Sequence, residues 1–364
     1  MRNTTRRTVY SGLALVGIGA LLAGCAAPPE DEGGSGESID YTPCIVSDFG
    51  GFDDQSFNES SYAGIEAAAD DLGVEFNEAE STAEDQYAGN VSGMVDQGCD
   101  FILTVGFALA NATRDAAEAN EDVNFALIDS GLSTDDGEPL ELDNVKPILY
   151  NTAEAAFLAG YLAAGTSETG TVGTFGGLQF PSVTIFMDGF VDGVAYYNEE
   201  KSADVTVLGW DKEAQDGLFT GGFEANQTAK TTAEGLLDQG ADVLLPVGGP
   251  IFISAGEAIR DRDDSAALIG VDSDLFLTAP DFSDLYLTSI LKQMTDAVEE
   301  VAVGAAEGDF DAAPYVGTLE NGGVDIAPLH DFESTVDEEL LTEIDEIREQ
   351  IISGDIVVES VSTP

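Results

Sequence analysis

Short apolar runs alternate with longer amphipathic stretches along the chain from residue 43 onward. The runs are rich in β-branched residues, which is typical of buried strands, and the stretches between them have helical spacing. Strands are expected at residues 43–47, 74–77, 101–105, 124–128, 145–150, 171–175, 205–208, 243–246, 267–271 and 285–289. Strands that alternate with helices indicate βαβ units and parallel sheets. The pattern therefore predicts an α/β protein with two doubly wound parallel-sheet lobes joined by a hinge.

The sequence predicts one amphipathic helix near the start of the folded part and another near its end. Residues 56–72 carry apolar side chains on one face before a stop at Gly73, and residues 336–352 repeat this spacing near the end of the chain. The first lobe is expected to comprise residues 41–150 and about 280–312. The second is expected to comprise residues 151–279 and about 313–364.

The first 40 residues have the pattern of an export signal followed by a tether. Residues 1–24 combine early arginines with a short apolar stretch, which predicts a signal peptide. The sequence Leu-Ala-Gly-Cys25 resembles a lipoprotein processing box, so Cys25 is expected to carry lipid and hold the protein on the outer face of the cell membrane. A signal peptide with a chance cysteine is the alternative. Residues 25–40, rich in Pro, Gly and acids, are expected to form a flexible tether.

The charge balance excludes one class of partner. The chain has 70 Asp and Glu against 12 Lys and Arg, a formal net charge of −58. Such a surface repels phosphate backbones, so nucleic-acid binding is excluded. The acids are spread among apolar runs, which indicates a folded protein adapted to very high salt, where screening suppresses the repulsion. A halophilic source and salt-dependent folding are expected.

Cys44 and Cys99 are the cysteines that remain beyond the leader. Each lies just before or early in an expected strand, and an extracellular location permits a disulfide. A disulfide and a pair of buried thiols both stay open.

Acidic side chains follow three of the expected strands. Asp48, Asp129 and Asp272 stand at carboxyl ends of strands, where open α/β sheets bind ligands. Each alone could simply cap the next helix. Together they indicate a site for a neutral polyol, because one carboxylate accepts hydrogen bonds from two hydroxyls.

A lysine and two aromatic residues complete the candidate site. Lys292 directly follows a strand in a chain that has few lysines. Phe57 lies at a helix entry, and Phe219 lies in a glycine-rich loop. The two rings could sandwich a flat base. Helix-core packing for Phe57 and a surface position for Lys292 are the alternatives.

Catalytic and metal motifs are missing from the sequence. His330 is the single histidine, and no Gly-x-Ser-x-Gly, His-Glu-x-x-His or Gly-Lys-[Ser/Thr] motif occurs. A non-enzyme without metal or cofactor is therefore expected.

The stretch Asp48-Phe-Gly-Gly-Phe-Asp-Asp-Gln-Ser-Phe-Asn-Glu-Ser resembles the signature of basic membrane protein (BMP-family) lipoproteins, the purine-nucleoside receptors of ABC importers. Residues 125–129, 155–161, 170–181, 240–243, 269–274 and 287–292 resemble further family stretches, in family order. The resemblance implies the two-lobed type I periplasmic-binding-protein fold. It also implies partners: a small ligand, an ABC permease and its ATPase subunits. A monomer is expected.

The same resemblance implies roles for individual residues. Asp48, Phe57 and Asn58 match ligand contacts of the first motif, with Phe57 stacking on the base. Asp129 matches a polar contact, and Asp272 and Lys292 match the acid and lysine near the sugar and hinge. Phe219 matches the second stacking face, although its loop reads Phe-Thr-Gly-Gly instead of the family's usual Phe-x-Asp-Pro.

Two other functions stay open beside nucleoside import. One is an extracellular nucleoside-processing enzyme, although the spacing of Asp48 and Asp53 does not fit the calcium motif of nucleoside hydrolases. The other is a lipoprotein that senses its ligand without transporting it. Riboflavin or a similar aromatic ribosyl compound is the alternative ligand.

Overall fold

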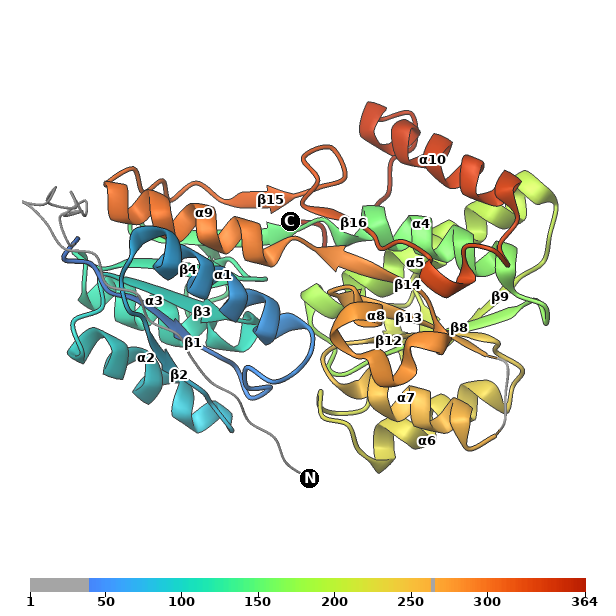
Figure 1. The fold of residues 1–364 in the computed structure, drawn as a ribbon, viewed down its shortest axis with the longest axis horizontal. Coiled ribbons are helices and arrows are strands. Elements are labelled where there is room, and N and C mark those ends of the chain that lie inside the picture. Colours follow the sequence, from blue (N-terminus) through green and yellow to red (C-terminus); the bar gives the residue numbers. More distant parts are fainter. Residues whose placement is uncertain (1–38, 263–265) are drawn as a thin grey trace, which may run out of the picture. The chain divides into compact units, whose positions relative to one another are not determined.

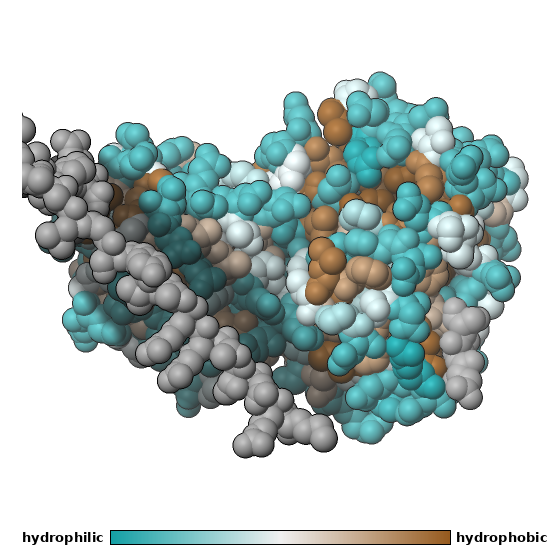
Figure 2. Space-filling view, viewed as in Figure 1, coloured by the Kyte–Doolittle hydropathy of each residue, from teal (hydrophilic) through white to brown (hydrophobic). Residues whose placement is uncertain are grey.

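Two six-stranded sheets, each covered by helices on both faces, form the framework of the chain (Figure 1). A computed structural model describes residues 39–262 and 266–364. The expected signal peptide, the lipidation site at Cys25 and nearly all of the tether lie outside the described residues. Hydrophilic side chains cover much of the face that Figure 2 shows.

The first sheet is parallel throughout and has the strand order β15-β7-β4-β3-β1-β2. Its strands are β1 Pro43–Val46, β2 Asn77–Ala79, β3 Phe101–Val105, β4 Asn124–Ile128, β7 Val145–Tyr150 and β15 Tyr315–Gly317. Alternate residues point to opposite faces. Ile45 therefore packs with α1 (Phe57–Leu72) and α9 (Met294–Glu307), while Cys44 and Val46 pack with α2 (Tyr87–Asp96) and α3 (Ala110–Ala119).

The second sheet has the order β16-β14-β13-β12-β8-β9 and is parallel except for β16. Its strands are β8 Thr171–Gly176, β9 Thr206–Leu208, β12 Val243–Val247, β13 Ala267–Asp272, β14 Tyr286–Lys292 and β16 Val324–Ile326. The same alternation divides its core. Leu245 faces α4 (Thr152–Thr166) and α5 (Pro181–Lys201), and Leu244 faces α6 (Gln227–Leu237) and α7 (Ile251–Arg260).

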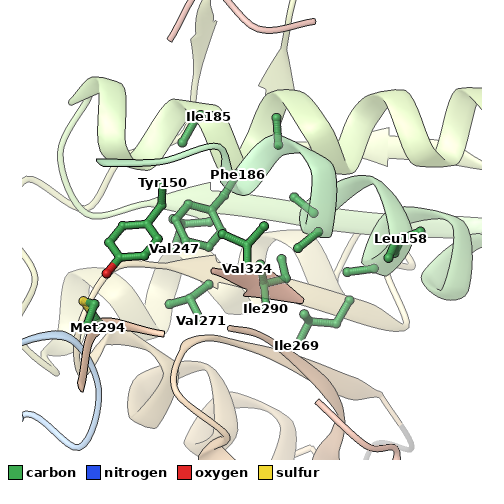
Figure 3. Close-up of a cluster of buried hydrophobic side chains, with 14 of the residues drawn as sticks. Tyr150, Leu158, Ile185, Phe186, Val247, Ile269, Val271, Ile290, Met294 and Val324 are labelled. Atoms are coloured by element: carbon green, nitrogen blue, oxygen red, sulfur yellow. The ribbon is translucent and has the colours of Figure 1, made fainter. Parts of the chain in front are cut away.

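Helices α4 and α5 are in unusually close contact. A Cβ on Gly160 would lie 2.2 Å from the carbonyl oxygen of Phe190, and a Cβ on Gly193 would lie 2.0 Å from that of Phe157. Only glycine allows this approach. Helix α4 is apolar on all sides and buried along most of its length, as expected for a helix enclosed by other elements. Figure 3 shows part of this core, in which Phe186 of α5 points toward the strands of the second sheet.

The remaining elements of the described chain are one long helix and several short elements. They are α8 Leu275–Thr278, α10 Glu338–Ser353, the two-stranded ribbons β5 Leu132–Ser133 with β6 Pro139–Leu140 and β10 Trp210–Asp211 with β11 Asp216–Gly217, and the 3-10 turns Glu84–Gln86, Phe107–Leu109, Pro280–Leu285 and His330–Phe332. Helix α10 packs on α4. Across residues 39–262 and 266–364, no helix combines the length and apolar character needed to cross a membrane.

The lobe boundaries differ from those expected. β14, assigned to the first lobe by the expected boundary near 280, belongs to the second sheet, and the chain returns to the first lobe only after Lys292. β15, assigned to the second lobe, is an edge strand of the first sheet. An apolar strand pattern identifies a strand but does not say which of two similar sheets it joins. The expected strand at 74–77 begins three residues later because the backbone first leaves α1 through Gly73 in the left-handed conformation.

A disulfide joins Cys44 in β1 to Cys99, which lies just before the neighbouring strand β3. Of the two alternatives that the sequence left open, the structure therefore contains the disulfide.

Candidate functional site

One pocket collects side chains from the carboxyl ends of strands in both sheets. Asp129 directly follows β4, Asp272 ends β13 and Lys292 ends β14. The Lys292 Nζ atom lies 2.5 Å from Asp129 Oδ2 and 3.2 Å from Asp272 Oδ1. All three side chains are at most 7% exposed. A single lysine therefore links one carboxylate of the first lobe to one of the second.

Asp129 and Asp272 share an unusual backbone conformation. Asp129 has φ = +61° and Asp272 has φ = +70°, so both strands end in a left-handed residue. Aspartate tolerates this conformation better than most non-glycine residues. Asp129 reaches Lys292 of the second sheet, and Asp272 contacts both Lys292 and Ser56 Oγ of the first lobe.

The environment keeps Lys292 charged. Burial alone would lower its pKa, but the carboxylates of Asp129 and Asp272 outweigh burial and raise the pKa above the usual value. The ammonium group also lies 5.1 Å from the ring centroid of Phe57 and 5.0 Å from that of Phe186. Aromatic faces attract a cation at this range. Two carboxylates around one cation leave this end of the pocket with a net negative charge and with acceptors for hydroxyl groups.

The other end of the pocket is built around Asn58 in the first turn of α1. Its amide Nδ2 donates to Asp48 Oδ1 at 2.9 Å and to Asp54 Oδ2 at 3.1 Å. Asp54 also accepts hydrogen bonds from the backbone N–H groups of Ser56, Asn58 and Glu59. It thereby fixes the start of the helix. Burial raises the pKa of Asp48 to about 6, opposed by hydrogen bonds from Asn58 and Gly50.

Aromatic rings from the two lobes meet around the pocket. Phe107 stacks on Phe180 with centroids 5.0 Å apart, and Phe49 stacks on Phe223 at 5.7 Å. In each pair the first ring belongs to the first lobe and the second ring to the second lobe. The pocket encloses about 620 Å³ with its open mouth included, and five phenylalanines line it: Phe57, Phe107, Phe180, Phe186 and Phe223. Small-molecule sites typically have this size and mixed apolar lining.

Six of the seven expected ligand-binding residues line this pocket. They are Asp48, Phe57, Asn58, Asp129, Asp272 and Lys292. Phe219 does not line it, which corrects the expectation for that residue. Its ring packs edge-on against Trp210 with centroids 6.0 Å apart and lies against Gly176 of β8.

Phe223 lies in the pocket in place of Phe219. The two phenylalanines are four residues apart in one glycine-rich loop, so residue type alone did not distinguish them. Asp54, Phe107, Phe180 and Phe186 also line the pocket without having been expected there. Asp54 lies within the quoted signature and could have been chosen as a helix cap. Phe107 and Phe180 carry no comparable signal.

Among the described residues, no group of three or more His, Cys, Asp or Glu side chains is arranged to hold a metal ion. The pocket carboxylates are instead occupied by the lysine ammonium, an amide and backbone N–H groups.

The sequence model of the family described as "ABC transporter substrate-binding protein PnrA-like" (Bmp) matches residues 43–362. The chain belongs to the Bmp family. Members of this family are substrate-binding proteins of ABC transporters, which supports a solute-binding role over an enzymatic one.

Relatives of the chain agree with this assignment. The "ABC transporter nucleoside-binding protein BmpA" of Lactococcus lactis subsp. cremoris is 27% identical over 98% of this chain and 99% of its own length. "Basic membrane protein A" of Borreliella burgdorferi is 27% identical over 90% of each chain. A solute-binding protein of an ABC transporter system from Aeropyrum pernix K1 has a similar solved structure, with a TM-score of 0.77, 24% identity, and coverage of 88% of this chain and 94% of its own. That likeness supports the two-lobed type I periplasmic-binding fold of this Bmp-family chain.

Proposed function

We propose that the chain is an extracellular, lipid-anchored solute-binding protein of an ABC importer and that it binds a nucleoside, in particular a purine nucleoside, between its lobes. The observation that carries the proposal is the link from Lys292 to one aspartate of each lobe, within a pocket lined by five phenylalanines. Carboxylates suit the hydroxyls of a ribose, and flat rings suit a base. The name of the Lactococcus relative points to the same class of ligand.

The charge of the pocket argues for nucleosides over nucleotides. Asp48, Asp54, Asp129 and Asp272 line it together with a single cation, Lys292, which two of them already engage. A phosphate group would meet uncompensated negative charge in a poorly solvated space. A neutral ligand avoids that repulsion.

The proposed location is the outer surface of the membrane, and the proposed partner is an ABC permease. A lipid on Cys25 would hold the protein at the outer surface, where an ABC permease could receive the ligand when the lobes open. Mass spectrometry of the membrane-bound protein is expected to find lipid on Cys25, and a Cys25→Ser variant is expected in the medium. Retention of that variant at the membrane would remove the anchor from the proposal.

Calorimetric titration of the mature protein in molar KCl against nucleosides, their 5′-monophosphates and riboflavin tests the ligand. A purine nucleoside is expected to bind with a Kd in the micromolar to nanomolar range, about −8 to −12 kcal/mol. Asp272→Ala is expected to weaken binding roughly 100-fold or more, because it leaves a buried lysine without one of its partners. Asp311→Ala, which changes an exposed carboxylate outside the pocket, serves as the control.

Two results would overturn the proposal. One is absence of nucleoside binding by the folded protein, and the other is steady release of free base from inosine, which would indicate a nucleoside-processing enzyme.

A further inference from the structure

Asn58 lines the pocket, and one polar atom of its side-chain amide is buried without a hydrogen-bond partner in the described part of the chain. Asn58 is 2% exposed and lines the pocket, yet its Oδ1 atom has no hydrogen-bond partner among the described residues. A buried acceptor without a partner is costly, so native proteins rarely leave one. A ligand that donates a hydrogen bond here would remove the cost.

The orientation of this amide is fixed by charge. Both Nδ2 hydrogens are engaged, one by Asp48 Oδ1 and the other by Asp54 Oδ2. The reverse orientation would place the amide oxygen against two carboxylates. Oδ1 is therefore held as an acceptor, with Asp54 as the residue that positions it.

A second acceptor stands beside the first. Asp48 Oδ1 accepts from Gly50 N at 3.1 Å and from Asn58 Nδ2, while Asp48 Oδ2 has no donor among the described residues. Gly106, at φ = +107°, leaves room next to this oxygen, since a Cβ there would lie 2.7 Å from it. Two oxygens at this end of the pocket, Asn58 Oδ1 and Asp48 Oδ2, thus have no donor among the described residues.

The two ends of the pocket are separated by about the length of a nucleoside. Asp48 follows β1 and Asp129 follows β4, and one strand, β3, lies between them in the sheet. Two strand spacings amount to about 10 Å. A nucleoside with its ribose at Lys292, Asp129 and Asp272 would therefore place its base edge at Asp48 and Asn58.

We propose that this acceptor pair selects guanosine among the purine nucleosides, with Asp54 as the positioning residue. The inference rests on the proposed function. Guanine presents two neighbouring donors on one edge, the ring N1–H and the 2-amino group. Hypoxanthine keeps only N1–H, and adenine presents an acceptor at N1. A site built to accept N–H groups discriminates strongly against analogues that lack them, because its buried acceptors stay unpaired.

A ligand series on the unmodified protein tests the inference. Guanosine is expected to bind roughly 10-fold or more tightly than inosine, and 1-methylguanosine is expected to lose at least as much. 7-Deazaguanosine, which keeps the two donors, is expected to stay within about threefold of guanosine. Equal affinities for guanosine and inosine would overturn the inference while leaving nucleoside binding intact. No binding of any nucleoside would instead refute the proposed function.

An Asp54→Asn variant tests the positioning role. Asparagine can still cap α1, but it no longer forces the Asn58 amide into one orientation. The ratio of guanosine to inosine affinity is expected to fall to within about threefold, while inosine affinity changes less than guanosine affinity. Asp337→Asn makes the same change at the cap of α10, remote from the pocket, and is expected to keep the ratio. A ratio that persists in folded Asp54→Asn would remove Asp54 from this role. The ligand series decides the rest of the inference even if that variant does not fold.

Discussion

Asp48 lines the pocket, but its buried carboxylate destabilises the folded protein when it is ionised. In the folded protein its pKa is raised to about 6 from an ordinary value of 3.8, chiefly because burial disfavours the charged form. Because the folded-state value is raised, the stabilising contribution of this group is full below about pH 4 and is lost as pH rises through 6. At neutral pH the ionised carboxylate costs on the order of 3 kcal/mol.

Asp48→Asn is therefore expected to raise the melting temperature at pH 8 in molar KCl. The gain over the unmodified protein is expected to shrink as pH falls from 8 to 5, because the native carboxyl is then increasingly neutral. The same change is expected to weaken guanosine binding by roughly tenfold or more, since an N–H group would replace an acceptor. Parallel thermal melts and titrations measure the two effects. A variant that melts lower at pH 8 would contradict this account of Asp48.

At the scale of elements, the loop before α1 is joined to the end of β13 and to the segment after it by hydrogen bonds across the lobes. Ser56 Oγ lies 3.1 Å from both Val271 O and Asp272 Oδ2. Ser273 Oγ and Thr278 Oγ1 both donate to the carbonyl oxygen of Gln55, at 3.1 and 2.9 Å. Ser273 and Thr278 do not line the pocket, so their bonds to Gln55 bear on closure and not on ligand contact.

Replacing these two donors is expected to weaken binding without touching the ligand. Each hydrogen bond contributes about 1 kcal/mol, so the double variant Ser273→Ala, Thr278→Val is expected to lose roughly 30-fold in affinity. The loss is expected in the dissociation rate, because the closed form opens more often. Stopped-flow dissociation measures it. Thr232→Val, a matched change on the exposed face of α6, serves as the control. An unchanged dissociation rate in the double variant would show that these bonds do not hold the lobes together.

Strand ends were the part of the site that the sequence could predict. Asp129 and Asp272 each follow a run of four or five buried apolar residues, and parallel strands present such ends along one edge. The orientation of the Asn58 amide could not be predicted, because it depends on Asp48 and Asp54 coming together in space. Phe223 could not be separated from Phe219, and β15 and β16, with three residues each, are too short to produce a pattern.

At the scale of the whole molecule, negative charge far exceeds what ion pairs can neutralise. Every Lys and Arg in the described part of the chain lies within 4 Å of a carboxylate: Arg114, Lys146, Lys201, Lys212, Lys230, Arg260, Arg262, Lys292 and Arg348. With 70 acidic residues in the full sequence, most carboxylates have no basic partner. Their mutual repulsion opposes the compact state unless ions screen it.

The fold is accordingly expected to depend on salt. The Debye length shortens from about 10 Å at 0.1 M salt to about 3 Å at 1 M. Lowering KCl from 3 M to 0.1 M is expected to reduce the melting temperature by more than about 10 °C, which corresponds to a loss of several kcal/mol. Thermal melts followed by circular dichroism measure the shift. Sorbitol, which carries no charge, is not expected to replace KCl.

Removing charges from helix α10 tests whether KCl stabilises the fold by screening charge or by another effect of salt. Glu339, Glu346 and Glu349 are exposed on it and form no ion pair among the described residues. The triple Glu→Gln variant keeps the shape of these side chains and removes three charges. At 0.1 M KCl it is expected to melt a few degrees higher than the unmodified protein, and in 3 M KCl the two melting temperatures are expected to be equal. Equal stabilisation at both concentrations would mean that the substitutions act through helix propensity. The variant could instead show no stabilisation at 0.1 M KCl while the melting temperature of the unmodified protein depends strongly on salt. That result would mean that KCl acts by strengthening apolar burial and not by screening.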